Sequence, residues 1–112
     1  MTYPVAMKPG TSIVGVSPEM AFGMVIIAGV FASRDVPCVV TACTDGPHMP
    51  GSLHYVGCAV DLRLPSRLRG SAADLAMVQE LRAALGPEWD VILETDHIHA
   101  EHDPKARERG SA

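Results

Sequence analysis

The stretch Cys58-Ala-Val-Asp-Leu-Arg-Leu64 alternates apolar and polar side chains. Successive side chains of an extended strand point to opposite faces. One face of this stretch is therefore apolar, and the other carries Ala59, Asp61 and Arg63. We predict a strand here and place the other elements around it.

The flanking sequence predicts two helices and three further strands. Ser17-Pro18-Glu19 supplies a hydroxyl cap, a first-position proline and a first-turn acid, so a helix should run over 17–33 and end before Pro37. Its nearly all-round apolar character predicts burial on most faces. Ser71 caps a second helix of about 14 residues that ends just before Gly86, with Leu75, Val78, Leu81 and Leu85 as its apolar stripe. Strands are predicted at 38–42, 89–93 and 97–101, which gives an α+β fold with an antiparallel sheet of about four strands flanked by helices.

Length and composition limit the possible functions. The chain has 112 residues, 47% hydrophobic, and a net charge of −4. This length predicts one domain, which we place at 17–102, after an irregular lead-in (1–16) and before a charged tail (103–112). Nine Lys and Arg and 4% aromatic residues argue against a nucleic-acid binder.

Targeting signals and cysteine chemistry are not evident in the sequence. The longest apolar run, residues 20–32, has 13 residues, whereas a membrane span needs about 20. No signal-peptide pattern opens the chain, so we expect a cytoplasmic protein at synthesis, without a membrane span. Three cysteines without C-x-x-C spacing predict neither a disulfide framework nor a cysteine-rich zinc site.

Two histidine-containing clusters predict a metal site. The first is Ser52-Leu-His54-Tyr-Val-Gly57-Cys-Ala59-Val-Asp61, and the second is Glu94-Thr-Asp96-His97-Ile-His99-Ala-Glu101. A catalytic zinc needs three protein ligands, for which imidazole and carboxylate are suitable, and an open position. His97 and His99 leave the same face of a strand, so one can bind metal while the other lies beside it. A nearby carboxylate can then act as general base.

The spacing Ser52-x-His54-x-x-Gly57-x-Ala59-x-Asp61, followed by His97-x-His99, resembles the zinc D-alanyl-D-alanine carboxypeptidase family, which includes phage L-alanyl-D-glutamate endopeptidases and the zinc module of hedgehog domains. The resemblance covers residues 17–102 and is greatest to short phage members. It implies a zinc cleft on the sheet, with His54, Asp61 and His99 as the zinc ligands.

The same resemblance suggests roles for the neighbouring residues. His97 matches the histidine that polarises the scissile carbonyl or binds the oxyanion. The general base is Asp96, three residues before the last ligand, or its rival Glu94. Because side chains alternate along a strand, both acids should lie on the face opposite His97 and His99 unless the chain turns or bulges at Thr95-Asp96.

One departure from the family concerns substrate binding. Members that bind a substrate carboxylate usually carry an arginine before the first cluster, but the matching stretch, residues 41–46, has none. Arg63, two residues after Asp61, is a candidate replacement as an anion clamp. Ser52 and Tyr55 are further candidate substrate-binding residues, although core packing is an alternative role for Tyr55.

We therefore predict a monomeric zinc metallopeptidase that hydrolyses peptidoglycan stem peptides, as a D,D-carboxypeptidase or endopeptidase, and acts on the cell wall when released or virion-associated. The alternative is a non-catalytic, zinc-stabilised cell-wall or virion binding module. The missing arginine and the small size motivate this alternative.

Overall fold

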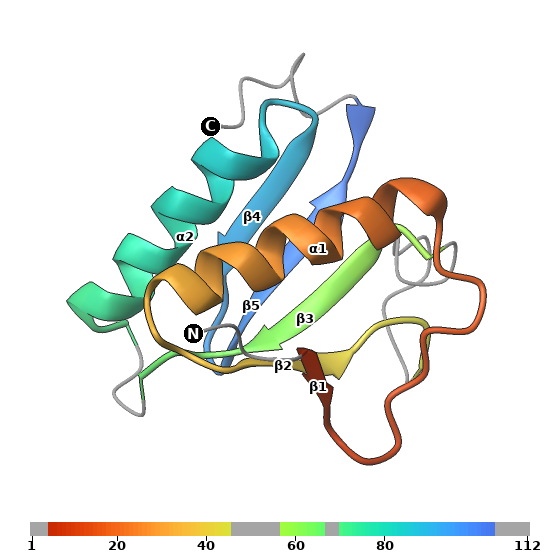
Figure 1. Cartoon of the computed structure of the whole chain (residues 1–112), viewed down its shortest axis with the longest axis horizontal. Coiled ribbons are helices and arrows are strands. Elements are labelled where there is room, and N and C mark those ends of the chain that lie inside the picture. Colours follow the sequence, from red (N-terminus) through yellow and green to blue (C-terminus); the bar gives the residue numbers. More distant parts are fainter. Residues whose placement is uncertain (1–4, 46–56, 67–69, 105–112) are drawn as a thin grey trace.

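The protein folds as one sheet with two helices on the same face, as the computed structural model shows for residues 5–45, 57–66 and 70–104 (Figure 1). This arrangement confirms the predicted α+β class. The described elements in chain order are β1 (Val5–Met7), α1 (Pro18–Ser33), β2 (Cys38–Ala42), β3 (Ala59–Arg63), α2 (Ala72–Leu85), β4 (Trp89–Leu93) and β5 (His97–His102).

The sheet has the strand order β1-β2-β3-β5-β4. Strands β2, β3, β5 and β4 are antiparallel neighbours, as the sequence predicts. The structure adds β1, which pairs in parallel with β2 inside the stretch predicted to be irregular. All three β1 residues are exposed, so this strand has no buried face that a sequence pattern could reveal.

Both helices begin at the predicted caps. The Ser17 hydroxyl accepts a hydrogen bond from the Met20 N–H at 3.0 Å, and the Ser71 hydroxyl accepts one from the Asp74 N–H at 3.3 Å. These bonds satisfy donors that the first helical turn leaves unpaired. At the other end of α2, Gly86 has a φ of 94°, a conformation that glycine adopts without a side-chain clash.

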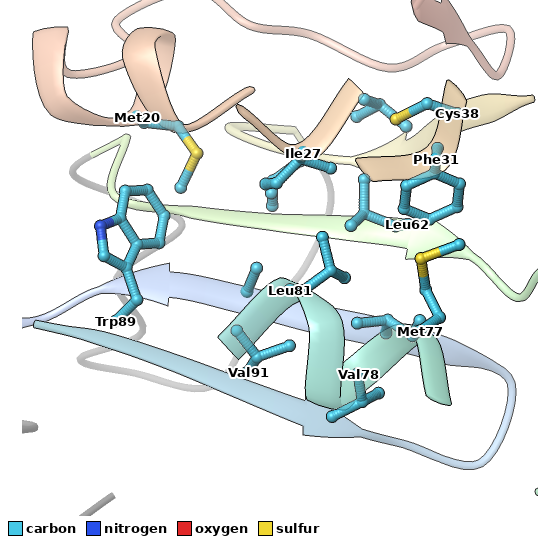
Figure 2. Packing of buried hydrophobic residues seen from close by; sticks show 14 of the residues in the cluster. Met20, Ile27, Phe31, Cys38, Leu62, Met77, Val78, Leu81, Trp89 and Val91 are labelled. Carbon is cyan, nitrogen blue, oxygen red and sulfur yellow. The ribbon is translucent and has the colours of Figure 1, made fainter. Parts of the chain in front are cut away.

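The core lies between the helices and one face of the sheet. Met20, Ile27 and Phe31 of α1 point towards the sheet, while Trp89 of β4 lies beside Met20 (Figure 2). The sheet contributes Val60 and Leu62, from the predicted apolar face of β3, together with Val91, Ile98 and Ala100. Burial of each large apolar side chain contributes about 1.5–3 kcal/mol, so this interface stabilises the fold.

Two expectations about helix faces are wrong. Helix α1 is not buried on most faces, because Phe22 and Val25 are 76% and 72% exposed. A helix in a two-layer fold contacts its sheet along one stripe only, whatever the composition of its outer side. Leu75 of α2 is 50% exposed, and Met77 is buried instead. In the part of the chain that the structure describes, no helix is long and apolar enough to cross a membrane.

Candidate functional site

The predicted chemistry lies on the sheet face opposite the helices, where β3 and β5 run side by side (Figure 1). Their register pairs Asp61 with His99 and Arg63 with His97. These residues alternate with Leu62 and Ile98, which are buried under the helices. Antiparallel pairing therefore brings residues 38 positions apart in sequence to adjacent places on one face.

His99 lies between two carboxylates. Its Nδ1 is 3.0 Å from Asp61 Oδ1, and its Nε2 is 2.8 Å from Glu101 Oε1. The side chains of Asp61, His99 and Glu101 are only 13%, 15% and 19% exposed. A neutral imidazole has a single N–H and can donate to only one of the two acids. A protonated imidazole has two N–H groups and can donate to both acids.

The charges around His99 favour its protonated form. Burial of the ring lowers the pKa of His99. The hydrogen bonds to Asp61 and Glu101, together with the negative charges of both acids, raise this pKa by a larger amount. The net pKa of His99 lies above its ordinary value of 6.5. A metal ion that bound this imidazole would have to displace its proton.

The donor chemistry at Asp61 and His99 fits zinc. Carboxylate oxygen and imidazole nitrogen bind zinc at about 2.0–2.2 Å, so two donors of a tetrahedral site lie about 3.4 Å apart. The observed 3.0 Å between Asp61 Oδ1 and His99 Nδ1 needs only a small adjustment. Glu101 accepts from the far ring nitrogen, which is the usual partner of a metal-binding histidine.

A complete ligand set is not visible in the described ranges. Within residues 5–45, 57–66 and 70–104, no group of three or more His, Cys, Asp or Glu is arranged to hold a metal ion. The third ligand implied by the family resemblance, His54, lies outside these ranges, as do Ser52 and Tyr55. The structure therefore brings together Asp61 and His99, and the roles of the other three residues stay predictions.

His97 and Asp96 lie at the edge of this group. His97 Nδ1 is 2.6 Å from Asp96 Oδ1, and His97 Nε2 is 3.6 Å from Asp61 Oδ1. The chain turns between β4 and β5, where the Glu94 N–H donates to the His97 carbonyl at 2.9 Å. Because of this turn, Asp96 lies beside His97 rather than on the opposite face. The choice between Asp96 and Glu94 as the candidate base stays a prediction.

Two small residues of the first cluster have structural roles. Gly57 has a φ of 74°, and a Cβ there would overlap the Gly15 carbonyl oxygen and lie 2.8 Å from Val16 Cα. The Gly57 carbonyl accepts a hydrogen bond from the Ser17 N–H at 3.0 Å, at the start of α1. Ala59 is completely buried. Gly57 is therefore required at its position for contact with the backbone at the start of α1, independently of any role in metal binding.

A pocket of about 270 Å³ lies next to His97, lined by Lys8, Thr41, Arg63, Asp96 and His97. The sequence predicted site roles for Arg63, Asp96 and His97. It indicated no role for Lys8, Thr41 or Glu101. Strand alternation could have placed Glu101 beside His99, because the two are separated by one residue. No local signal could have found Lys8, which reaches the site through the pairing of β1 with β2.

Comparison with known proteins gives no family: no family model, curated protein or solved structure matches the chain.

Proposed function

We propose that the chain is a zinc-dependent peptidase that hydrolyses peptide bonds in peptidoglycan stem peptides. The observation that carries the proposal is the position of His99, held between Asp61 and Glu101, with Asp96 and His97 next to it. The substrate class is supported only by the resemblance of the two residue clusters to zinc peptidases of that kind.

The zinc ligands in this proposal are Asp61, His99 and His54. Zinc, when bound, supplies Lewis acidity that polarises a carbonyl and favours loss of a proton from water. Glu101 orients His99 by accepting from Nε2, which leaves Nδ1 turned towards Asp61. The limited exposure of these side chains keeps bulk water away from the charges and strengthens their interaction.

Proton transfer is assigned to Asp96, whose side chain is 66% exposed and open to substrate. Asp96 accepts a proton from the water that attacks the scissile carbonyl, and returns it to the leaving amine when the carbon–nitrogen bond breaks. His97 donates to Asp96 through Nδ1 and, when protonated, donates through Nε2 to the negative oxygen of the tetrahedral adduct.

The test is digestion of a muropeptide mixture by the purified, zinc-supplemented protein, followed by mass spectrometry. We expect products that gain one water per cleaved peptide bond and that disappear when a chelator is added. Asp96→Asn should lower turnover by at least a hundredfold, whereas the matched Glu94→Gln should retain most activity. Cleavage that ignores the chelator, or equal loss in both variants, would contradict the assigned roles.

The same experiment separates the alternative, a non-catalytic zinc-stabilised binding module. Both functions predict that the Asp96→Ala, Glu94→Ala double variant still binds zinc. Only the peptidase predicts that this variant loses an activity that the wild-type protein has. Stoichiometric zinc with no cleavage of any muropeptide would reject the peptidase in favour of the binding module.

A further inference from the structure

We propose that the outward face of α1 is the interface of a symmetric dimer, in which two copies of this chain pack their α1 helices antiparallel. The proposal replaces the monomer expected from the sequence and does not depend on the proposed peptidase function. It starts from three apolar side chains of α1 that lie in solvent: Phe22 is 76% exposed, Val25 72% and Ile26 41%.

The exposed side chains form one stripe along α1. Residues 22, 25, 26 and 29 follow the spacing i, i+3, i+4, i+7, which places side chains on one face of a helix. Met20, Ile27 and Phe31 lie on the other face, against the sheet (Figure 2). At Gly29 an added Cβ would have no packing neighbour within 4 Å, so the stripe ends in open space there.

The stripe carries no charge. Residues 20–33 contain no Asp, Glu, Lys, Arg or His, although a solvated surface helix normally has such residues on its outer side. The charges that give the chain its net −4 therefore lie outside this face. Two copies can bring their stripes together without burying an ion. A covered stripe would also explain why the outer side of α1 is as apolar as its buried side.

The stripe is complementary to itself in an antiparallel pair. Phe22 and Gly29 lie at equal distances on either side of the Val25–Ile26 bond. Two helices related by a two-fold axis at this bond place Phe22 of each copy over Gly29 of the other. The phenyl ring then fills the space left by the glycine, and the helices can approach closely. Parallel packing would instead oppose Gly29 to Gly29 and leave a gap.

The charges at the helix ends also suit the antiparallel arrangement. Glu19 is the charged residue nearest the stripe at the N-terminal end of α1. In the antiparallel pair, the two Glu19 residues lie at opposite ends of the contact, about 20 Å apart at 1.5 Å per residue. The two helix dipoles run in opposite directions, so their interaction is favourable.

The exposed area is sufficient for a weak dimer. The stripe offers roughly 500 Å² of apolar surface, which is as large as the largest apolar patch of a typical soluble protein. Two copies would together bury about 1,000 Å², the lower limit for a specific interface. We therefore expect a dissociation constant of about 10–100 µM.

The dimer leaves the candidate site accessible, because α1 and the pair Asp61 and His99 lie on opposite faces of the sheet (Figure 1). Dissociation should therefore leave any peptidase activity per chain unchanged. A monomeric peptidase would reject the dimer alone, and an inactive dimer would reject the peptidase alone.

The test is sedimentation velocity of the full chain between about 1 and 500 µM, across the range expected for the dissociation constant. The wild-type protein should change from monomer to dimer. Phe22→Glu places a charge in the interface and should stay monomeric, with its circular dichroism unchanged because Phe22 is exposed in the protomer. Leu75→Glu makes the same change at an exposed leucine of α2 and should dimerise like the wild-type protein.

Exchange of side-chain size tests the antiparallel register. Gly29→Leu fills the space that receives Phe22 and should weaken dimerisation by at least tenfold. The Phe22→Ala, Gly29→Leu double variant again places a large residue opposite a small one. It should dimerise at least threefold more tightly than Gly29→Leu alone, which neither parallel packing nor non-specific association predicts.

Three results would overturn the proposal: a wild-type monomer at the highest concentration, unweakened dimerisation of Gly29→Leu, or a monomeric Leu75→Glu. Vesicles of neutral phosphatidylcholine test a different occupant of the same face. Binding of a monomeric wild-type chain to these vesicles, lost in Phe22→Glu, would assign the stripe to a lipid surface and reject the dimer.

Discussion

At the scale of single residues, the site is defined by an imidazole with more acceptors than a neutral ring can satisfy. His99 faces Asp61 and Glu101 with both nitrogens, at 3.0 and 2.8 Å. A neutral ring donates to one of these carboxylates, and a protonated ring donates to both. A metal ion bound between Asp61 and His99, as we propose, would leave the hydrogen bond to Glu101 in place.

The first prediction concerns Glu101. Glu101→Gln should lower zinc affinity by about ten- to a hundredfold, because the partner that orients His99 is weakened. Asp61→Asn, which removes a ligand charge, should lower it further. Competition with a zinc-sensitive dye measures both effects. Glu19→Gln, an exposed change on α1, should leave the affinity unchanged, and equal affinities in all four proteins would exclude this zinc site.

The second prediction concerns Cys38, which is 2% exposed in β2. Burial raises the pKa of its thiol from 9.0 to about 11. The unfolded chain therefore ionises first as pH rises, and the thiol's contribution to stability, complete below pH 9, is lost between about 9 and 11. Between pH 9 and 10 the free energy of unfolding should fall by about 1 kcal/mol more in the wild-type protein than in Cys38→Ala. Urea denaturation at both pH values measures this difference, and parallel losses would contradict it.

At the scale of elements, α1 shows how position decides the effect of a substitution. Gly23 faces the sheet, where an added Cβ would overlap the Trp89 indole. Gly29 lies in the same helix with no atom within 4 Å of an added Cβ. The two glycines therefore have different roles, one in close packing and one exposed.

The third prediction uses this pair. Gly29→Ala should stabilise the protein by up to about 1 kcal/mol, because alanine has the higher helix propensity. Gly23→Ala gains the same propensity but displaces Trp89, and should destabilise the protein by about 1–3 kcal/mol. Thermal denaturation of both variants measures the difference, and stabilisation by Gly23→Ala would show that the indole can move away at little cost.

At the scale of the whole molecule, the candidate site links segments that are distant in the chain. Asp61 and His99 come from strands separated by α2 and β4. Neither the proposed ligand pair nor the orienting contact exists until the sheet has formed, so metal binding at this site would be coupled to folding.

The fourth prediction follows from this coupling. At free zinc a hundredfold above the dissociation constant, binding adds about 2.7 kcal/mol to the free energy of unfolding. For a domain of this size, chelation should lower Tm by about 10 °C. The Asp61→Asn variant should show the same low Tm with and without chelator. An unchanged Tm of the wild-type protein after verified zinc removal would count against the coupling.

Much of the fold could be predicted because its signals are local. The caps at Ser17 and Ser71 and the alternation around Asp61 depend on residues close in sequence. Strand β1 and the exposed side of α1 could not be predicted, because each depends on what the rest of the fold places beside it. Within the site, the alternation of side chains predicted the faces of β3 and β5 on which Asp61 and His99 lie. The side on which Asp96 lies could not be predicted in this way, because it depends on the turn before β5.

The sequence by itself determined which segments form helices and strands, which side of a strand is apolar, and which histidines and acids are candidates for the site. Backbone hydrogen bonding, side-chain alternation and capping act over a few residues, so these features are encoded where they occur. Only the tertiary structure decided that Asp61 meets the neighbouring His99 and Glu101, that Asp96 turns towards His97, and that Lys8 joins Arg63 in a pocket. These contacts depend on strand order and register, which are fixed when the whole sheet packs against α1 and α2.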